Sequence, residues 1–429
     1  MTSPSADAEG TRAHAHRAAE RVARESYGRL LALLAARTRD LAGAEDALAD
    51  AFSAALRTWP ERGVPDNPDG WLLTAARHRQ TDAARRRQTQ AAHVDHLQRM
   101  ADELEHASTA ADGIPDRRLA LMFACAHPAI DAATRAPLML QTILGMTADA
   151  IAQAFLVPPA TMGQRLSRAK ARIRQTGIPF RMPDREELPE RLDAVLEAIY
   201  ATYTRGWADT GDDGPSAFAD EAIWLGQLVV SLLPEEPEAK GMLALMLFSE
   251  ARRGARRDGD GAYVPLDSQD VALWNGGLVQ EAEALLHQAS AGGPTGRYQL
   301  EAAIQSAHVA RRRSRLDVRR AIVALYDHLV ALTGSPVVRL NRAVAVADLE
   351  GAEAGLDALA VLADDTRMLS YQPYWAARGH LLALAGRASE ARDALGVAQG
   401  LSTDDAVRRY LEYQRAALAT PSAPTARRP

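Results

Sequence analysis

The side chains best suited to chemistry in this sequence lie in a basic, amphipathic segment at residues 161–174. Met162, Leu166, Ala169 and Ile173 recur at the spacing of one helix face, which predicts a helix with a buried stripe. The other side of this helix and its flanks carry, without any acid, Gln164, Arg165, Arg168, Lys170, Arg172 and Arg174. Guanidinium groups in this arrangement suit guanine edges and phosphates in a DNA major groove. A solvated basic face without a ligand is the alternative interpretation.

A short helix is expected directly before this basic helix. Thr147 is placed to cap it, and Asp149 lies favourably in its first turn. Residues 156–159 then break the pattern with Pro158 and Pro159. A short helix, a break and a basic amphipathic helix together predict a helix-turn-helix.

An acidic helix followed by a basic one is predicted near the start of the chain. Residues 40–59 bury a stripe of Leu and Ala and expose Glu45, Asp46 and Asp50, a face suited to a protein partner rather than to DNA. The next helix begins near Trp71 and carries Arg77, His78, Arg79, Arg85, Arg86 and Arg87. An aromatic side chain with arginines suits single-stranded DNA, because bases stack and phosphates attract cations. Packing of Trp71 in the core is the alternative.

A third polar cluster lies much later in the chain. It consists of Glu250, Arg252, Arg253, Arg256, Asp267, Gln269, Asp270 and Trp274. We interpret it either as a small-molecule or peptide site or as a salt-bridge network that holds two helices and a loop together.

Composition favours an all-α protein of several domains and gives no sign of catalysis. The 429 residues are 47% hydrophobic but only 5% aromatic, a mixture rich in helix formers. Cys125 is the single cysteine, is expected to be a buried thiol, and excludes an internal disulfide. The histidines at positions 93, 96, 106 and 127 match no metal-site spacing, so we expect no metal, no cofactor and no enzyme. No apolar run is long enough to span a membrane, and we expect a cytoplasmic protein.

The region after residue 189 reads as helix after helix. Residues 335–362 resemble residues 370–395 at an offset of 35, with Gly351 aligned to Gly386, Leu340 to Trp375 and Ala347 to Leu382. This period is close to the ~34 residues of tetratricopeptide helical hairpins. A helical array is therefore favoured over a single bundle.

Together these segments resemble the sigma-70 family of RNA polymerase sigma factors, in particular its extracytoplasmic-function branch. Two segments resemble sigma region 2, AEDALADAF (44–52) and GWLLTAARHRQTDAARRR (70–87). One segment resembles region 4, TADAIAQAFLVPPATMGQRLSRAKARI (147–173). A further resemblance is to the sigma group with a C-terminal tetratricopeptide-like extension. It rests on FACAHPAID, AIWLGQLVVSLLPEEP, LALMLFSEARRGARR, LDSQDVALW, YQLEAAI and SPVVRLNRAVA.

Composition and the resemblance together predict a domain order, and the resemblance implies a set of roles. The order is a disordered N-terminus (1–16), region 2 (17–87), a linker (88–116), region 4 (117–177), a linker (178–188), a helical-repeat regulatory extension (189–418) and a disordered tail (419–429). The chain would bind core polymerase at its flap and at the clamp helices of its largest subunit. The residues that would contact the clamp helices are Glu45, Asp46 and Asp50. The minus-ten element would be opened and held by Trp71, Arg77, His78, Arg79, Arg85, Arg86 and Arg87. The minus-thirty-five element would be read by Thr161, Gln164, Arg165, Ser167, Arg168 and Arg172.

The sequence departs from the family pattern at several positions. His78 stands where Asn is usual, Ala49 where Gln is common, Gly163 where Lys or Arg often occurs, and Gln80-Thr81 replaces a small apolar pair. These changes bear on promoter choice, because a lost base contact shifts specificity by about 1–3 kcal/mol. The alternative function is a helix-turn-helix regulator that works without polymerase and carries a helical-repeat ligand sensor.

Overall fold

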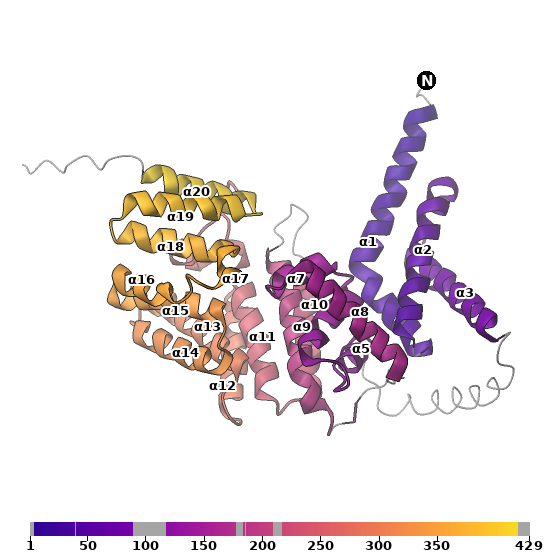
Figure 1. Cartoon of the computed structure of the whole chain (residues 1–429), viewed down its shortest axis with the longest axis horizontal. Coiled ribbons are helices and arrows are strands. Elements are labelled where there is room, and N and C mark those ends of the chain that lie inside the picture. Colours follow the sequence, from indigo (N-terminus) through magenta and orange to yellow (C-terminus); the bar gives the residue numbers. More distant parts are fainter. Residues whose placement is uncertain are drawn as a thin grey trace, which may run out of the picture. The chain divides into compact units, whose positions relative to one another are not determined.

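The structure is a computed structural model that describes residues 4–38, 40–88, 117–176, 183–184, 186–208 and 217–418 (Figure 1). These residues form helices, and their β pairing is limited to an isolated bridge between Arg257 and Tyr263. The predicted all-α class is confirmed. The predicted tail, the linker at 88–116 except its first residue, and much of the linker at 178–188 lie outside the described residues. None of the described helices is both long and apolar enough to span a membrane.

The chain divides into two compact units, residues 1–225 and 226–429. The first unit contains α1 (Pro4–Thr38), α2 (Leu41–Arg62), α3 (Pro68–Gln88), α5 (Arg117–Cys125), α6 (Ala132–Leu144), α7 (Ala148–Ala154), α8 (Pro159–Thr176), α9 (Leu188–Ala208) and the first part of α10 (Ala217–Leu232).

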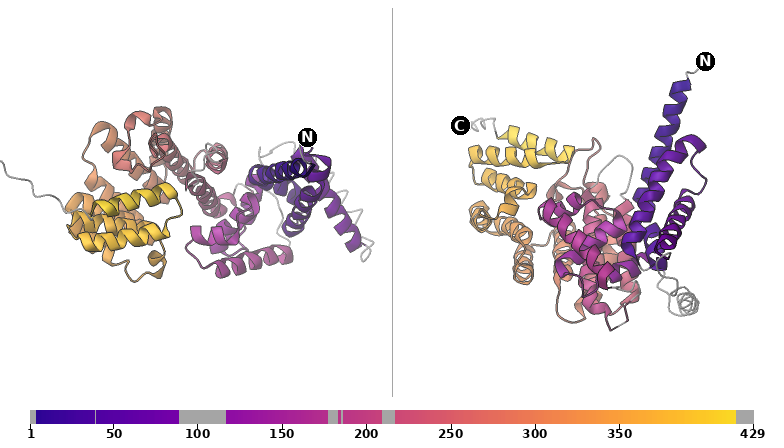
Figure 2. Two further views of the ribbon diagram at one scale, coloured as in Figure 1. Left: turned by 90° about the horizontal axis from the view of Figure 1, so that it is seen from above. Right: turned by 45° about the vertical axis from the view of Figure 1, so that its right-hand side comes forward.

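Helices α1, α2 and α3 pack against one another at the start of the first unit, as Figures 1 and 2 show. Asp40 caps α2 by accepting a hydrogen bond from the Gly43 amide at 2.9 Å, which fixes the start predicted from the sequence. The predicted stripe is buried along α2, and it continues to Trp59. Helix α1 begins at Pro4, so the disorder predicted for residues 1–16 is wrong from residue 4 onward. Its early residues are rich in alanine, which favours continuation of the helix.

Helices α5, α6 and α9 build a second core in the same unit. Phe123, Leu138 and Val195 are each almost completely buried there. Cys125 is also buried, with its Sγ atom 3.9 Å from Oγ1 of Thr142, and burial raises the pKa of its thiol to about 12. The predicted buried thiol is therefore confirmed, and it is held in its unreactive protonated form.

The second unit is a succession of helical pairs. It contains α11 (Pro237–Glu250), the 3-10 turns η1 (Arg253–Ala255), η2 (Leu266–Ser268) and η3 (Val271–Leu273), α12 (Gly276–Ser290), α13 (Arg297–Ser314), α14 (Arg319–Thr333), α15 (Pro336–Glu350), α16 (Ala352–Ala360), α17 (Thr366–Leu369), α18 (Gln372–Leu384), α19 (Ala388–Leu401) and α20 (Asp405–Ala417). Figure 1 shows α15 with α16, and α18 with α19, as stacked hairpins.

The predicted 35-residue repeat coincides with these two hairpins. Gly351 separates α15 from α16 with a φ of 103°, and Gly386 lies between α18 and α19 with a φ of 74°. Both angles fall in the region that favours glycine, so the aligned glycines provide equivalent turns between paired helices. The sequence periodicity thus corresponds to a structural period.

Candidate functional site

The acidic face of α2 has an exposed part and a covered part. Asp46 and Asp50 are exposed, as predicted. Glu45 differs from the prediction, because its side chain is only 15% exposed and its Oε2 atom lies 2.8 Å from Nζ of Lys170 on α8. Burial raises the pKa of Glu45, although the Lys170 ammonium acts in the opposite direction. The exposed acidic surface therefore consists of Asp46 and Asp50, whereas Glu45 joins α2 to α8.

Trp71, near the start of α3, packs against Trp59 of α2. Their ring centroids are 5.7 Å apart and the rings meet edge to face at 69°. Trp59 is fully buried, and Trp71 is half-buried. Asp69, two residues earlier, accepts a hydrogen bond from the Ser26 hydroxyl at 3.0 Å, which ties the start of α3 to α1. These contacts favour a packing role for Trp71.

We expect Trp59→Ala to lower the free energy of unfolding by about 3–5 kcal/mol, because it removes a buried aromatic side chain. Trp71→Ala should lower the free energy of unfolding by a smaller amount, since the Trp71 ring is only half-buried. Chemical denaturation measures both changes, with Leu56→Ala on α2 as the control because Leu56 is 39% exposed. Unchanged stability in Trp71→Ala would contradict its packing role.

The later part of α3 presents the predicted basic side chains. Arg77, His78 and Arg79 are exposed. Arg85, Arg86 and Arg87 lie within α3, but their side chains fall outside the described residues. Gln80 is buried, and neither polar atom of its amide has a hydrogen-bond partner among the residues that the structure describes. Nothing in the surrounding basic sequence indicated this burial, because an amide in a polar run is ordinarily exposed.

The helices α7 and α8 lie where the sequence predicts the short and the basic helix. The Thr147 hydroxyl caps α7 by accepting a hydrogen bond from the Ala150 amide at 3.3 Å. The break includes Leu156 in the left-handed region, with a φ of 52°, and α8 begins at Pro159, a residue suited to the first turn of a helix. The predicted stripe on α8 is buried, from 0% exposed at Met162 to 7% at Ala169.

The opposite side of α8 borders an 830 Å³ hollow. Gln164, Ser167, Arg168 and Arg172 are exposed, while Thr161 and Arg165 are half-buried. The three arginines line the hollow together with the start of α6 and the residues just before it, namely Ala129, Ile130, Asp131, Ala133 and Thr134. The positive end of the α6 dipole and the guanidinium groups favour an anion, and the Asp131 carboxylate partly offsets them. The contribution of α6 was missed, because it comes from a distant part of the sequence.

Comparisons with known proteins identify the family. Residues 22–90, which span much of α1 with α2 and α3, match the model described as sigma-70 region 2. The chain therefore carries a sigma-70 region 2 domain, which supports a place in the sigma-70 family. Region 2 of that family implies binding to core RNA polymerase and promoter DNA.

Three further findings concern the later part of the chain or the chain as a whole. Residues 191–290 match a family of unknown function, DUF6596. An uncharacterized protein of Rhizobium meliloti (strain 1021) is 39% identical over 383 residues, which cover 88% of this chain and 90% of that protein. No solved structure matches the chain. The similarity to the Rhizobium protein therefore extends over nearly the whole length of both chains.

The start of the DUF6596 match packs within the first unit of the sigma factor. Helix α9 lies against α5 and α6, and the buried Arg191 donates a hydrogen bond to the Phe123 carbonyl at 3.4 Å. At the start of α10, Glu221 forms a 2.6 Å ion pair with Arg118, whose guanidinium also lies 5.0 Å from the centre of the Trp224 ring. The extension was predicted to begin at residue 189 as a separate domain, whereas α9 and this part of α10 belong to the core built on α5 and α6.

The predicted cluster at 250–274 separates into two parts. Glu250 and Arg253 form a bidentate ion pair with separations of 2.6 and 2.8 Å, and Arg252 donates to Gln305 at 2.7 Å, so these residues hold helices together. Arg256 is half-buried and Trp274 is buried. Asp267, Gln269 and Asp270 lie apart from them, beside arginines at the end of α13 that the sequence analysis missed.

Proposed function

We propose that this sigma factor is of the extracytoplasmic-function type and that it docks on core polymerase through α2, with Asp46 and Asp50 as the exposed contacts. In this proposal α3 holds the opened minus-ten strand and α8 reads the minus-thirty-five element. The observation that carries it is the occurrence of the region 2 match and of a basic-faced helix, α8, in one compact unit. The match points to a transcription factor rather than to an enzyme.

The energetics of strand opening explain why such a protein needs its polymerase. Separating DNA costs about 1.4 kcal/mol for each base-pair step. Each flipped base returns about 1–3 kcal/mol by stacking. The two terms nearly cancel over a short element, so opening requires a partner that holds both DNA-binding modules in register. The sigma factor therefore contributes binding energy and recognition, and polymerase performs the chemistry.

The side chains of α3 and α8 support the two DNA contacts. Arg77, His78 and Arg79 are exposed on α3, and Arg165 and Arg168 line the hollow beside α6. A phosphate in that hollow would meet guanidinium donors and the positive end of a helix dipole together. The same hollow would orient α8 on its DNA without a base contact.

The helical hairpins of the second unit are proposed to be tetratricopeptide-like and to set the activity of the sigma factor. The packing of α9 and the start of α10 on α5 and α6 supports this proposal, because it makes the beginning of the extension continuous with the core that supports α8.

We expect a chain that ends at residue 232, which lacks α11 to α20, to fold but to differ from the full chain by about fivefold or more in promoter-dependent transcription. Run-off transcription with core polymerase measures the difference. A chain that ends at residue 187 is the comparison, because loss of α9 exposes the apolar surface of α5 and α6, and we expect it to aggregate. Equal transcription by the 232-residue chain and the full chain would contradict a regulatory extension.

A further inference from the structure

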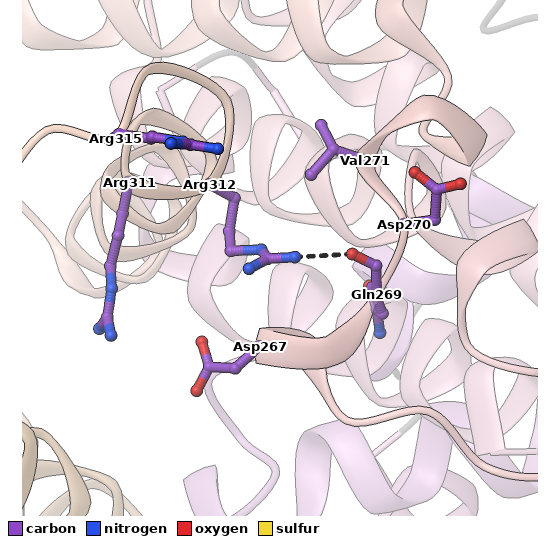
Figure 3. A pocket seen from close by; sticks show the side chains of 7 residues that line it. All are labelled: Asp267, Gln269, Asp270, Val271, Arg311, Arg312 and Arg315. Carbon is purple, nitrogen blue, oxygen red and sulfur yellow. Dashed lines mark hydrogen bonds between the residues drawn. The ribbon is translucent and has the colours of Figure 1, made fainter.

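A 530 Å³ cavity in the second unit lies between the loop that follows α11 and the end of α13 (Figure 3). The loop contributes Asp267, Gln269, Asp270 and Val271, and the helix contributes Arg311, Arg312 and Arg315. The volume is in the range of small-molecule sites, about 300–1,000 Å³. Its lining is mainly charged, so an apolar ligand is excluded and a charged one is favoured.

Several of these charged groups are held in place by the protein. The Arg311 guanidinium is paired with both carboxylate oxygens of Asp348. Arg312 donates from Nη2 to the Gln269 carbonyl at 2.7 Å, the bond drawn in Figure 3. Asp270 accepts from the Ala272 amide at 2.9 Å. The walls of the cavity are therefore ordered before any ligand arrives, which lowers the entropic cost of binding.

Two buried polar atoms in the lining lack partners among the described residues. Gln269 is 5% exposed, and its Nε2 atom donates to the Val264 carbonyl while its Oε1 atom accepts nothing. The Nε atom of Arg312 is also buried and has no acceptor. Leaving such groups unpaired costs about 1–3 kcal/mol each. Both atoms belong to residues that line the cavity, and Arg312 is joined to the main chain of Gln269 by the bond drawn in Figure 3.

Two charged groups complete the lining without internal partners. Asp267 and Arg315 are exposed, and neither forms a hydrogen bond or ion pair with the part of the chain that the structure describes. Arg315 ends α13 in the left-handed conformation, with a φ of 55°. A non-glycine residue in this region is uncommon, and the conformation places its guanidinium at the edge of the cavity (Figure 3).

We propose that this cavity binds a small zwitterion of the α-amino acid type. Its carboxylate would accept from Arg312 and Arg315, and its ammonium group would donate to Gln269 and Asp267. A zwitterion fits because the lining presents exposed groups of both charges, Arg315 and Asp267, whereas a bare anion would leave the Asp267 carboxylate without a partner. The inference is independent of the proposed function, because binding is a property of the full chain without polymerase or DNA.

Calorimetric titration of the full chain with individual L-amino acids tests the proposal. At least one of them is expected to bind, and its N-acetyl and carboxamide derivatives, which lack one charge each, are expected to bind about tenfold or more weakly. Inorganic phosphate is the probe for a bare anion site. If no amino acid binds at about 10 mM, or if phosphate binds as tightly as the best amino acid, the proposal is overturned.

Two variants locate the site, and a third serves as the matched control. Arg315→Gly removes the guanidinium and suits the left-handed backbone, and Gln269→Leu removes the unpaired acceptor at similar volume. Each is expected to weaken binding about tenfold. Arg313→Ala removes an exposed arginine from the same last turn of α13, outside the cavity, and should leave binding unchanged. Binding that survives both cavity variants, with thermal unfolding unchanged, overturns the assignment.

Discussion

The double substitution Asp46→Arg and Asp50→Arg is expected to weaken association with core polymerase about a hundredfold or more, because like charges placed across an interface cost several kcal/mol. Both side chains are exposed on one face of α2, opposite its buried stripe, so the change should leave the fold intact. Glu45 is a poorer choice for this test, since its reversal would also break the ion pair with Lys170. Equilibrium binding to purified core polymerase measures the effect.

The matched control is Asp357→Arg with Asp364→Arg. Both residues are exposed acids of the second unit, so the control changes the net charge equally without touching α2. Association that is unaffected by the α2 substitutions would mean that this face does not bind polymerase. DNA binding that persists without polymerase would then favour a polymerase-independent regulator.

The second large effect is expected at α8. Arg168→Ala and Arg165→Ala should each reduce transcription about 5- to 150-fold on promoters with the correct upstream element, since a bidentate base contact contributes about 1–3 kcal/mol. Run-off transcription on paired templates, one with that element intact and one with it scrambled, separates two kinds of contact. Loss confined to the intact template indicates base reading, and equal loss on both indicates a phosphate contact.

The control for α8 is Arg12→Ala, which removes an exposed arginine from α1, outside the region 2 match. It should leave both templates unaffected. If the α8 variants behave like Arg12→Ala, α8 does not read the upstream element. A melting curve for each variant excludes loss of fold, and none is expected, because the buried stripe from Met162 to Ile173 is untouched.

Features that depend on neighbours along the chain could be predicted from the sequence. The caps at Asp40 and Thr147 and the stripes of α2 and α8 follow from local hydrogen bonds and helix periodicity. The 35-residue repeat was visible because two hairpins place a glycine at the same turn. The caps and stripes involve residues within one or two helical turns of each other, where spacing alone determines which side chains meet.

Features that depend on distant residues could not be predicted. Glu45 and Lys170 are far apart in sequence, and nothing in an acidic helix indicates that one carboxylate will be covered. The arginines at the end of α13 complete a cavity whose acids lie about 40 residues earlier in the chain. A local sequence pattern does not show that two such distant segments come together. The early start of α1 was missed for a different reason, because a polar, alanine-rich segment is equally compatible with a helix and with a disordered terminus.

The Glu45–Lys170 pair joins α2, which carries the exposed acids, to α8, which carries Arg165 and Arg168. While the pair is formed, each charge neutralises the other. Under the proposed function, a protein partner that bound Glu45 would release the Lys170 ammonium for a polyanion on α8. By thermodynamic reciprocity, a polyanion that bound Lys170 would release the Glu45 carboxylate to the same extent in free energy. Binding of the two partners would then be positively coupled through one ion pair.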